Sequence, residues 1–209
     1  MIPRPRFASR RATLARLAAL ALAAACRPWP ALASPDGARE FIQKLGERAL
    51  ATMKTRQDRR EAVKKLIDDG LDIEALGRFA LGPFLRQSNP KRVEEYLAVF
   101  RDYVMMAYPD MLAKFELRNF EIVSSKDLGD ASFVTTTIEY GDKDKAELGW
   151  YVREVKPGQY KIQDVQLEGY SLRAFQRAKF EKILRERWID GLIRILGNWI
   201  KAGREEPYF

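Results

Sequence analysis

The spacing of apolar residues changes twice along the chain, and this order limits the fold more than any other feature. Between residues 36 and 115, apolar residues recur every three or four positions, which is the spacing of one helix face. Four β-rich segments follow: "NFEIVS", "ASFVTTTIEY", "AELGWYVREV" and "QYKIQDVQL". Helical spacing then returns towards the end of the chain. We therefore expect an α+β fold in which helices pack on a sheet.

The connections between the β-rich segments are short and polar: "SKDLGD", "GDKDK" and "KPG". Short connections make neighbouring strands antiparallel, so we expect a curved, mostly antiparallel four-stranded sheet. In the fourth segment Tyr160 and Ile162 alternate towards one face, but Val165 and Leu167 alternate towards the other. A β-bulge near Gln163–Asp164 would return all four residues to one face and bend the strand.

The boundaries of the helices carry recognisable signals. In "QSNP", Ser88 or Asn89 can cap a long helix whose first turn contains Pro90. We expect Pro109 to kink or interrupt that helix, because proline removes a backbone donor. Two helices should follow Ser171, the second of them in "DGLIRILGNWI".

The basic character of the chain is concentrated at its start. A net charge of +8 favours an anionic partner such as nucleic acid or a membrane surface. However, six arginines and no acids precede Ser34, which leaves a net charge of +2 for the remainder. An apolar run, "LARLAALALAAA", then leads to "ALAS", with Ala31 and Ala33 in the small-x-small positions of a cleavage site. We expect residues 1–33 to be an export signal and residues 34–209 to be a single domain.

The export route stays open between the twin-arginine and Sec pathways. "SRRATL" resembles a twin-arginine motif, although Thr13 and Ala15 depart from it. Cys26 is the only cysteine, and Arg27 makes it a poor lipidation site. Cleavage after Ala33 would leave an exported protein without a disulfide, stabilised by packing alone even in an oxidising compartment.

The residues that most enzymes use are scarce. The chain has no histidine, and the expected mature part has no cysteine, which removes the commonest general base, metal ligands and thiol nucleophile. There is no glycine-rich phosphate loop. Lys and Arg alternate with acids instead of interleaving with aromatic residues, so we expect no nucleic-acid binding. We expect no metal, no cofactor and no enzymatic activity.

Ser171 is the one residue that invites a catalytic interpretation. In "EGYSLRAF" it lies between a strand and a helix, the context of a hydrolase nucleophile. Arg173 stands where that motif needs a second glycine, and no histidine is available as a base. We therefore predict that Ser171 caps the following helix and that Gly169 permits the sharp exit from the strand.

Several stretches together resemble one family. They are "LGRFALGPFLRQSNPKRVEEYLAVFRDYVMMAY", the strand around Trp150, "YKIQDVQLEGYSL", "QRAKF" and "IDGLIRIL". In this order, behind an export signal, they resemble the MlaC-type periplasmic phospholipid-shuttle proteins, also called the toluene-tolerance auxiliary family. Lys179 stands where the family usually has Glu, and "GYS" replaces "GVS". These departures leave the branch open, including one associated with hopanoid lipids.

The resemblance implies helices and a curved sheet that enclose an apolar pocket for the acyl chains of a phospholipid or related lipid. It also implies a soluble carrier between an outer-membrane lipoprotein complex and an inner-membrane ABC transporter complex. The alternatives are a carrier of another lipid, such as a hopanoid, and a non-catalytic periplasmic scaffold. For the pocket that the resemblance implies, we select these lining residues: Phe79, Leu97, Phe100, Val104, Ile138, Trp150, Val152, Ile162, Val165, Ile183 and Leu192. On physical grounds alone, a filled core accounts for them at least as well as a pocket.

Overall fold

The sheet is built from strands that are adjacent both in sequence and in space. They are β1 (Leu117–Asp127), β2 (Ser132–Tyr140), β3 (Asp144–Lys156), β4 (Gln159–Leu167) and β5 (Tyr170–Ser171), in the order β1-β2-β3-β4-β5. Every neighbouring pair is antiparallel, and the sheet is open. The expected α+β class is confirmed. The expected four strands become five because Tyr170 and Ser171 pair back onto the end of β4.

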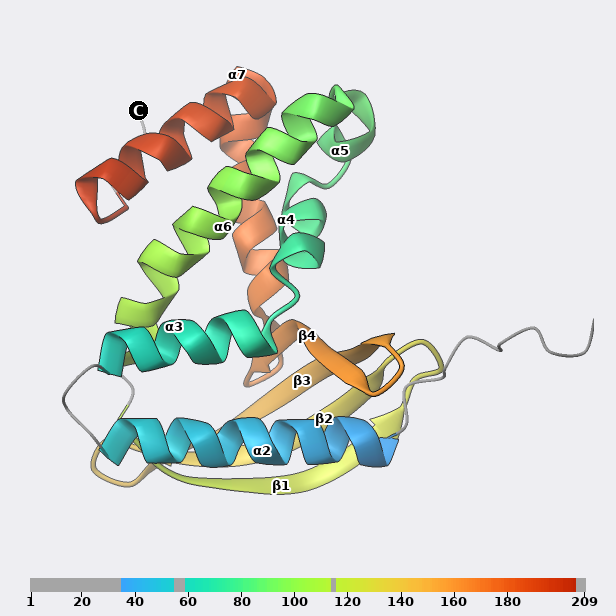
Figure 1. Cartoon of the computed structure of the whole chain (residues 1–209), viewed down its shortest axis with the longest axis vertical. Coiled ribbons are helices and arrows are strands. Elements are labelled where there is room, and N and C mark those ends of the chain that lie inside the picture. Colours follow the sequence, from blue (N-terminus) through green and yellow to red (C-terminus); the bar gives the residue numbers. More distant parts are fainter. Residues whose placement is uncertain (1–34, 55–58, 114–115, 206–209) are drawn as a thin grey trace, which may run out of the picture. The chain divides into compact units, whose positions relative to one another are not determined.

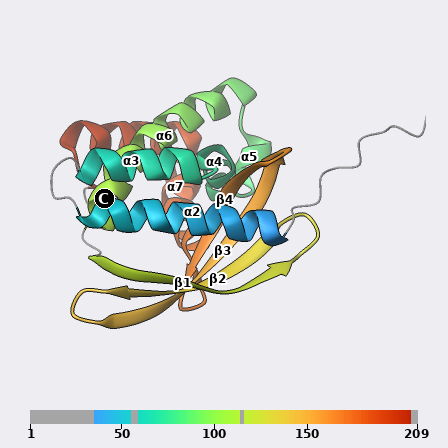
Figure 2. The ribbon, with the colours of Figure 1, turned by 60° about the horizontal axis from the view of Figure 1, so that its bottom comes forward.

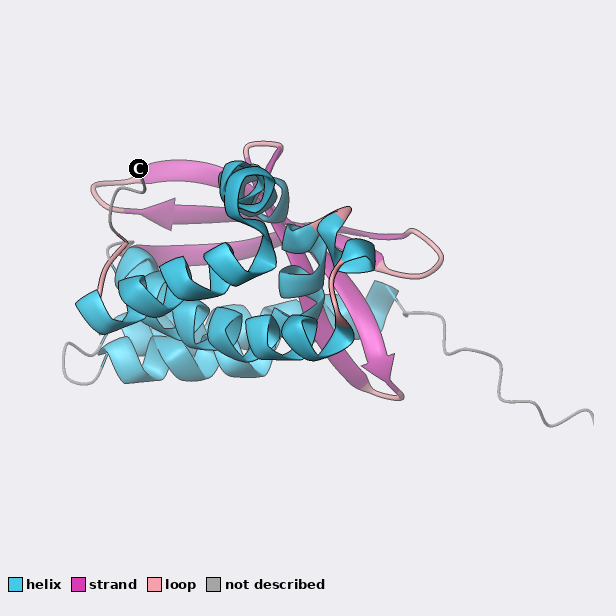
Figure 3. Cartoon of the chain, turned by 90° about the horizontal axis from the view of Figure 1, so that it is seen from above, coloured by secondary structure: helices cyan, strands magenta, loops and turns pink. Residues whose placement is uncertain are grey.

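The helices lie on one side of this sheet, and α2 packs along its face. They are α2 (Pro35–Lys54), α3 (Arg59–Gly70), α4 (Ile73–Leu81), α5 (Phe84–Gln87), α6 (Pro90–Ala113) and α7 (Leu172–Ala202). In Figures 1 and 2, α2 runs along the sheet and α3 lies beside α2 on the side away from the strands. Figure 3 shows the helices and strands from above. No helix in the described part of the chain is both long enough and apolar enough to cross a membrane.

This computed structural model describes residues 35–54, 59–113 and 116–205. The expected export signal at residues 1–33 lies outside the described residues.

The helix that begins at Pro90 runs without interruption to Ala113. Asn89 caps it, because its side-chain Oδ1 accepts a hydrogen bond from the backbone N–H of Lys91 at 2.9 Å. Pro109 does not interrupt this helix, since α6 continues to Ala113, and a kink at Pro109 stays a prediction. Apolar neighbours of Pro109, such as Leu112, pack against the helical core. That packing offsets the hydrogen bond that proline removes.

The last helix is divided at Trp188. This residue has φ 56° and ψ −170°, so the helical backbone breaks there and resumes beyond it. The break separates the two helices that the sequence predicts. An L-residue rarely adopts such a positive φ, and the surrounding packing must hold Trp188 in place. Its ring contacts Phe84 edge to face, with ring centroids 5.6 Å apart.

The predicted bulge in β4 is confirmed. Tyr151 pairs with Asp164 and the next residue, Val152, pairs with Ile162, which leaves Gln163 as the extra residue. Ile162 and Val165 therefore lie on the same face, opposite Val152 and Trp150 respectively. The bulge converts a split apolar pattern into one continuous apolar face.

Lys161 and Ile162 of β4 attach α3 and α4 to the sheet. The Lys161 ammonium donates hydrogen bonds to the carbonyl oxygens of Asp68 at 2.8 Å and Asp69 at 3.0 Å, in the last turn of α3. A cation is favourable there because the last carbonyls of a helix carry partial negative charge. The backbone N–H of Asp72 donates to the Ile162 carbonyl at 2.9 Å.

Gln163 completes this attachment through the same turn. Its side-chain amide donates to one carboxylate oxygen of Asp72 at 3.1 Å. The other oxygen of Asp72 accepts from the backbone N–H of Ala75 at 3.1 Å and caps α4. Three consecutive residues of β4 thus fix where α3 ends and α4 begins.

The buried apolar side chains form two clusters. The helical cluster lies among α3, α4, α6 and α7 and includes Phe100, Phe180 and Leu192. The sheet cluster consists of Ala38 and Ile42 of α2 with Val134, Val152 and Ile162 of the sheet. Leu71, in the turn between α3 and α4, packs against both clusters.

Two helical glycines differ in the space around them: Gly77 in α4 is tightly surrounded, and Gly197 in α7 is not. A Cβ at Gly77 would lie 2.8 Å from side-chain atoms of both Leu97 and Phe100, whereas a Cβ at Gly197 would meet nothing within 4 Å. We predict that Gly77→Ala lowers the free energy of unfolding by about 1–3 kcal/mol through overpacking. The control Gly197→Ala should raise it by up to about 1 kcal/mol, because alanine favours the helix. Urea denaturation measures both, and equal effects of the two substitutions would contradict the packing described here.

Candidate functional site

The sheet supplies one group of the predicted pocket residues. Ile138, Trp150, Val152, Ile162 and Val165 lie on the face that the helices cover, as the register of the strands dictates. Val152 and Ile162 belong to the sheet cluster, and Trp150 and Val165 pack against it half-buried. Ile138 is buried on the same face. The structure therefore brings these residues together on one apolar surface.

Trp150 is fixed on this surface by a hydrogen bond. Its indole Nε1–H donates to the hydroxyl of Thr136 on β2 at 2.8 Å. The ring is half-buried, and Thr136 is fully buried. A tryptophan held at its nitrogen keeps one orientation and presents its apolar surface to its neighbours.

The helices supply the second group. Phe100, Val104, Ile183 and Leu192 are buried in the helical cluster, and Leu97 packs against it half-buried. Phe100 meets Phe180 edge to face, with ring centroids 6.1 Å apart. The structure thus divides the predicted residues between two clusters rather than gathering all of them around one point.

Phe79 belongs to neither cluster, and its ring contacts two arginines. The guanidinium carbon of Arg173 is 4.6 Å from the ring centroid of Phe79, and that of Arg177 is 5.6 Å away. Arg173 also lies 5.3 Å from the ring of Tyr151 on β3. Such contacts hold a cation by attraction to the ring face. Sequence reasoning missed these arginines, although their four-residue spacing places them on one face of α7.

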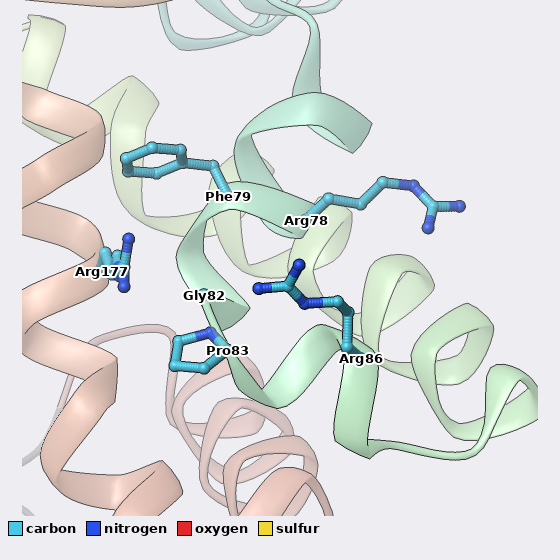
Figure 4. A pocket seen from close by; sticks show the side chains of 6 residues that line it. All are labelled: Arg78, Phe79, Gly82, Pro83, Arg86 and Arg177. Carbon is cyan, nitrogen blue, oxygen red and sulfur yellow. The ribbon is translucent and has the colours of Figure 1, made fainter.

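An open hollow lies beside Phe79. It has a volume of about 460 Å³ and is lined by Arg78, Phe79, Gly82, Pro83, Arg86 and Arg177. Figure 4 shows these side chains, which come from α4, the turn after it, α5 and α7. A second open hollow of about 470 Å³ lies between α2 and α3. Neither is the enclosed apolar pocket that the family resemblance implies, so that pocket stays a prediction.

Ser171 caps the last helix, as predicted. Its hydroxyl oxygen accepts from the backbone N–H of Ala174 at 3.1 Å, and its O–H donates to Asp164 at 2.6 Å. The Asp164 side chain is 3% exposed and accepts further from the backbone N–H of Arg173 at 3.1 Å. Asp164 also pairs with the Arg173 guanidinium at 3.5 Å. The serine is therefore engaged both as donor and as acceptor in a structural role.

A polar seam crosses the helical cluster. The amide oxygen of Gln176 accepts a hydrogen bond from Tyr108 at 3.2 Å, and the Tyr103 hydroxyl oxygen lies 3.5 Å from the same oxygen. Tyr103 and Lys179 both donate to Glu205, which lies beyond the end of α7. Burial, with Glu205 nearby, raises the pKa of Tyr108 to about 12, and burial chiefly raises the pKa of Tyr103 as well. Both hydroxyls therefore stay protonated and act as donors at neutral pH.

No group of three or more His, Cys, Asp or Glu side chains in the described residues could hold a metal ion. The charged groups near Phe79 are instead mainly guanidinium groups.

Comparison with known proteins decides the family. Residues 36–198 match the sequence profile of the family described as MlaC protein. The chain belongs to the MlaC family. A solved structure of the phospholipid-binding protein from Ralstonia solanacearum, in complex with a phospholipid, has the same fold with a TM-score of 0.64. The two chains are 20% identical, and the match covers 79% of this MlaC-family chain and 98% of the Ralstonia chain.

Asp164 should be the most sensitive carboxylate of the α7 attachment. We predict that Asp164→Ala lowers the free energy of unfolding by about 3 kcal/mol, because three donors lose a buried charged acceptor. The control Asp142→Ala, at a fully exposed position in a turn, should change it by less than about 0.5 kcal/mol. Urea denaturation followed by circular dichroism compares the two. An Asp164→Ala variant as stable as the control would show that the attachment does not depend on this carboxylate.

Proposed function

We propose that this protein is a periplasmic lipid carrier that binds phospholipid acyl chains and releases them to membrane-bound partners. The observation that carries the proposal is membership of the MlaC family over residues 36–198. A protein of the same fold was solved with a phospholipid bound, and this supports the same class of ligand here.

The arrangement of apolar side chains also supports the proposal. The acyl chains would lie between the sheet face that carries Trp150 and Val165 and the helical cluster that contains Phe100 and Ile183. The half-buried residues at the boundary, among them Trp150, Val165 and Phe79, would become covered when chains enter. Each methylene that leaves water contributes about 0.8 kcal/mol to the free energy of binding, so burial of two acyl chains strongly favours binding.

Transport sets an upper limit on this affinity. A carrier must hide the chains about as well as a bilayer does, yet release them again. Direction must then come from partners. We propose that the partners are an outer-membrane lipoprotein complex and an inner-membrane ABC transporter complex, and that residues 1–33 direct export to the compartment between them.

Ser171 gives little support to the competing hydrolase hypothesis. Its hydroxyl donates to Asp164 at 2.6 Å and caps α7, so its proton and one of its lone pairs are already engaged. A nucleophile needs a base that is free to accept its proton, whereas Asp164 is already paired with Arg173. A carrier performs no covalent step, so the proposed function needs no nucleophile.

Lipid loading tests the proposed function. The protein, purified from its periplasm without detergent, should contain glycerophospholipid at up to one molecule per chain, measured by lipid extraction and mass spectrometry. It should also take up phospholipid from vesicles. If the protein contains no acyl lipid and takes none up, the proposed function is wrong. A sterol-like lipid in place of glycerophospholipid would instead support the hopanoid alternative.

Trp150 should be needed for loading. We predict that Trp150→Arg reduces lipid uptake at least tenfold, because it places a charge on the apolar sheet face. Trp150→Phe should keep most of the uptake, since the ring remains and only the hydrogen bond to Thr136 is lost. Circular dichroism establishes that both variants are folded. A folded Trp150→Arg variant that loads like the parent would exclude this face from the binding site.

A further inference from the structure

The open hollow beside Phe79 presents an unbalanced set of positive charges. Three of its six lining residues are arginines, and none is an acid. Arg78 is paired with Glu74, 2.8 Å away. Within the described residues, no carboxylate lies within ion-pair distance of Arg86 or Arg177. Two guanidinium groups therefore face a single space without a neutralising partner, which raises the positive potential there.

The backbone is shaped to leave room for one of these arginines. Gly82 has φ 54°, and a Cβ built on it would lie 2.8 Å from Nε of Arg177. A side chain at position 82 would therefore displace the Arg177 guanidinium from its present place. In Figure 4 the guanidinium of Arg86 points over Gly82 and Pro83 from the side opposite Arg177, whereas Arg78 extends away from Arg177.

One wall of the hollow is aromatic. Phe79 forms this wall, and its ring also contacts Arg173, which reaches Tyr151 on the sheet. An anion in the hollow would consequently lie next to an aromatic ring that Arg173 links to the sheet. A free inorganic ion would contact only the charged groups. A molecule with a charged head and apolar chains would contact the aromatic ring as well.

We propose that this hollow is a phosphate site, in which Arg86 and Arg177 bind the phosphodiester group of a phospholipid headgroup. The planar fork of a guanidinium matches two oxygens of a phosphate group, and charge-assisted hydrogen bonds of this kind are the strong ones. The proposal rests on the proposed carrier function and adds headgroup selection to it. Arg78 contributes positive charge, but its partner Glu74 reduces that contribution.

The test compares two lipids with the same acyl chains and different heads. Vesicles of phosphatidylglycerol carry the phosphate, and vesicles of digalactosyldiacylglycerol carry an uncharged sugar head. The full chain is incubated with each, recovered, and its bound lipid measured by mass spectrometry. The parent protein should take up phosphatidylglycerol about tenfold more than the galactolipid, as expected for one or two charge-assisted contacts.

The variant Arg86→Gln/Arg177→Gln should lose this preference by lowering uptake of phosphatidylglycerol about tenfold. Its uptake of the galactolipid should not change, which also shows that the variant is folded. The control is Arg185→Gln on α7, whose side chain is 70% exposed and pairs with Glu181. This control should behave like the parent with both lipids.

The possible outcomes separate the two proposals. If the parent takes up neither lipid, the carrier function itself fails. If it takes up both equally, or if the double variant keeps the preference, the carrier function stands and the phosphate site is wrong. Calorimetric titration with inorganic phosphate distinguishes the source of the anion. Binding of phosphate at micromolar concentration that the double variant abolishes, without any lipid preference, would assign the hollow to free phosphate and overturn the headgroup proposal.

Discussion

The attachment of the helices to β4 is the interaction on which the rest of the structure depends. Residues 161–163 hold the turn between α3 and α4 through four hydrogen bonds of 2.8–3.1 Å. The next residue, Asp164, holds the start of α7 through Ser171 and the backbone of Arg173. A single strand with a bulge therefore sets the positions of three helices. It also sets the distance between the helical cluster and the sheet cluster, and with it the space available to a ligand.

The same attachment positions the charged and aromatic groups around Phe79. The turn bonded to β4 starts α4, which carries Phe79, and the capped end of α7 carries Arg173 and Arg177. Both faces of the Phe79 environment are thus tied to β4, one through Asp72 and the other through Asp164. The proposed carrier function would use both parts: the apolar surfaces for the acyl chains and the arginines around Phe79 for the headgroup.

Much of the fold is predictable from the sequence because it depends on local patterns. The period of apolar residues identified the helices and the strands, and the change of phase within "QYKIQDVQL" located the bulge. Ser171 was recognised as a cap from its neighbours alone. The attachment to β4 was not predictable, because Lys161 and Gln163 lie about ninety residues from their partners and no spacing rule connects them. The open hollow beside Phe79 was not predictable for the same reason. Arg86 and Arg177 are far apart in the sequence and line one hollow only in the folded chain. α6 continues past Pro109 because tertiary packing outweighs the local preference of proline.

In the proposed carrier, acyl chains bind between the helical cluster and the sheet face. The most direct measurement is photocrosslinking with a phospholipid that carries a diazirine near the end of one acyl chain, followed by mapping of the labelled peptides. We expect labels on β3 and β4, which carry Trp150 and Ile162. We also expect labels on α6 and α7, which carry Phe100 and Ile183. Labels confined to exposed aromatic residues such as Tyr170 and Phe175, with none on these strands and helices, would contradict it.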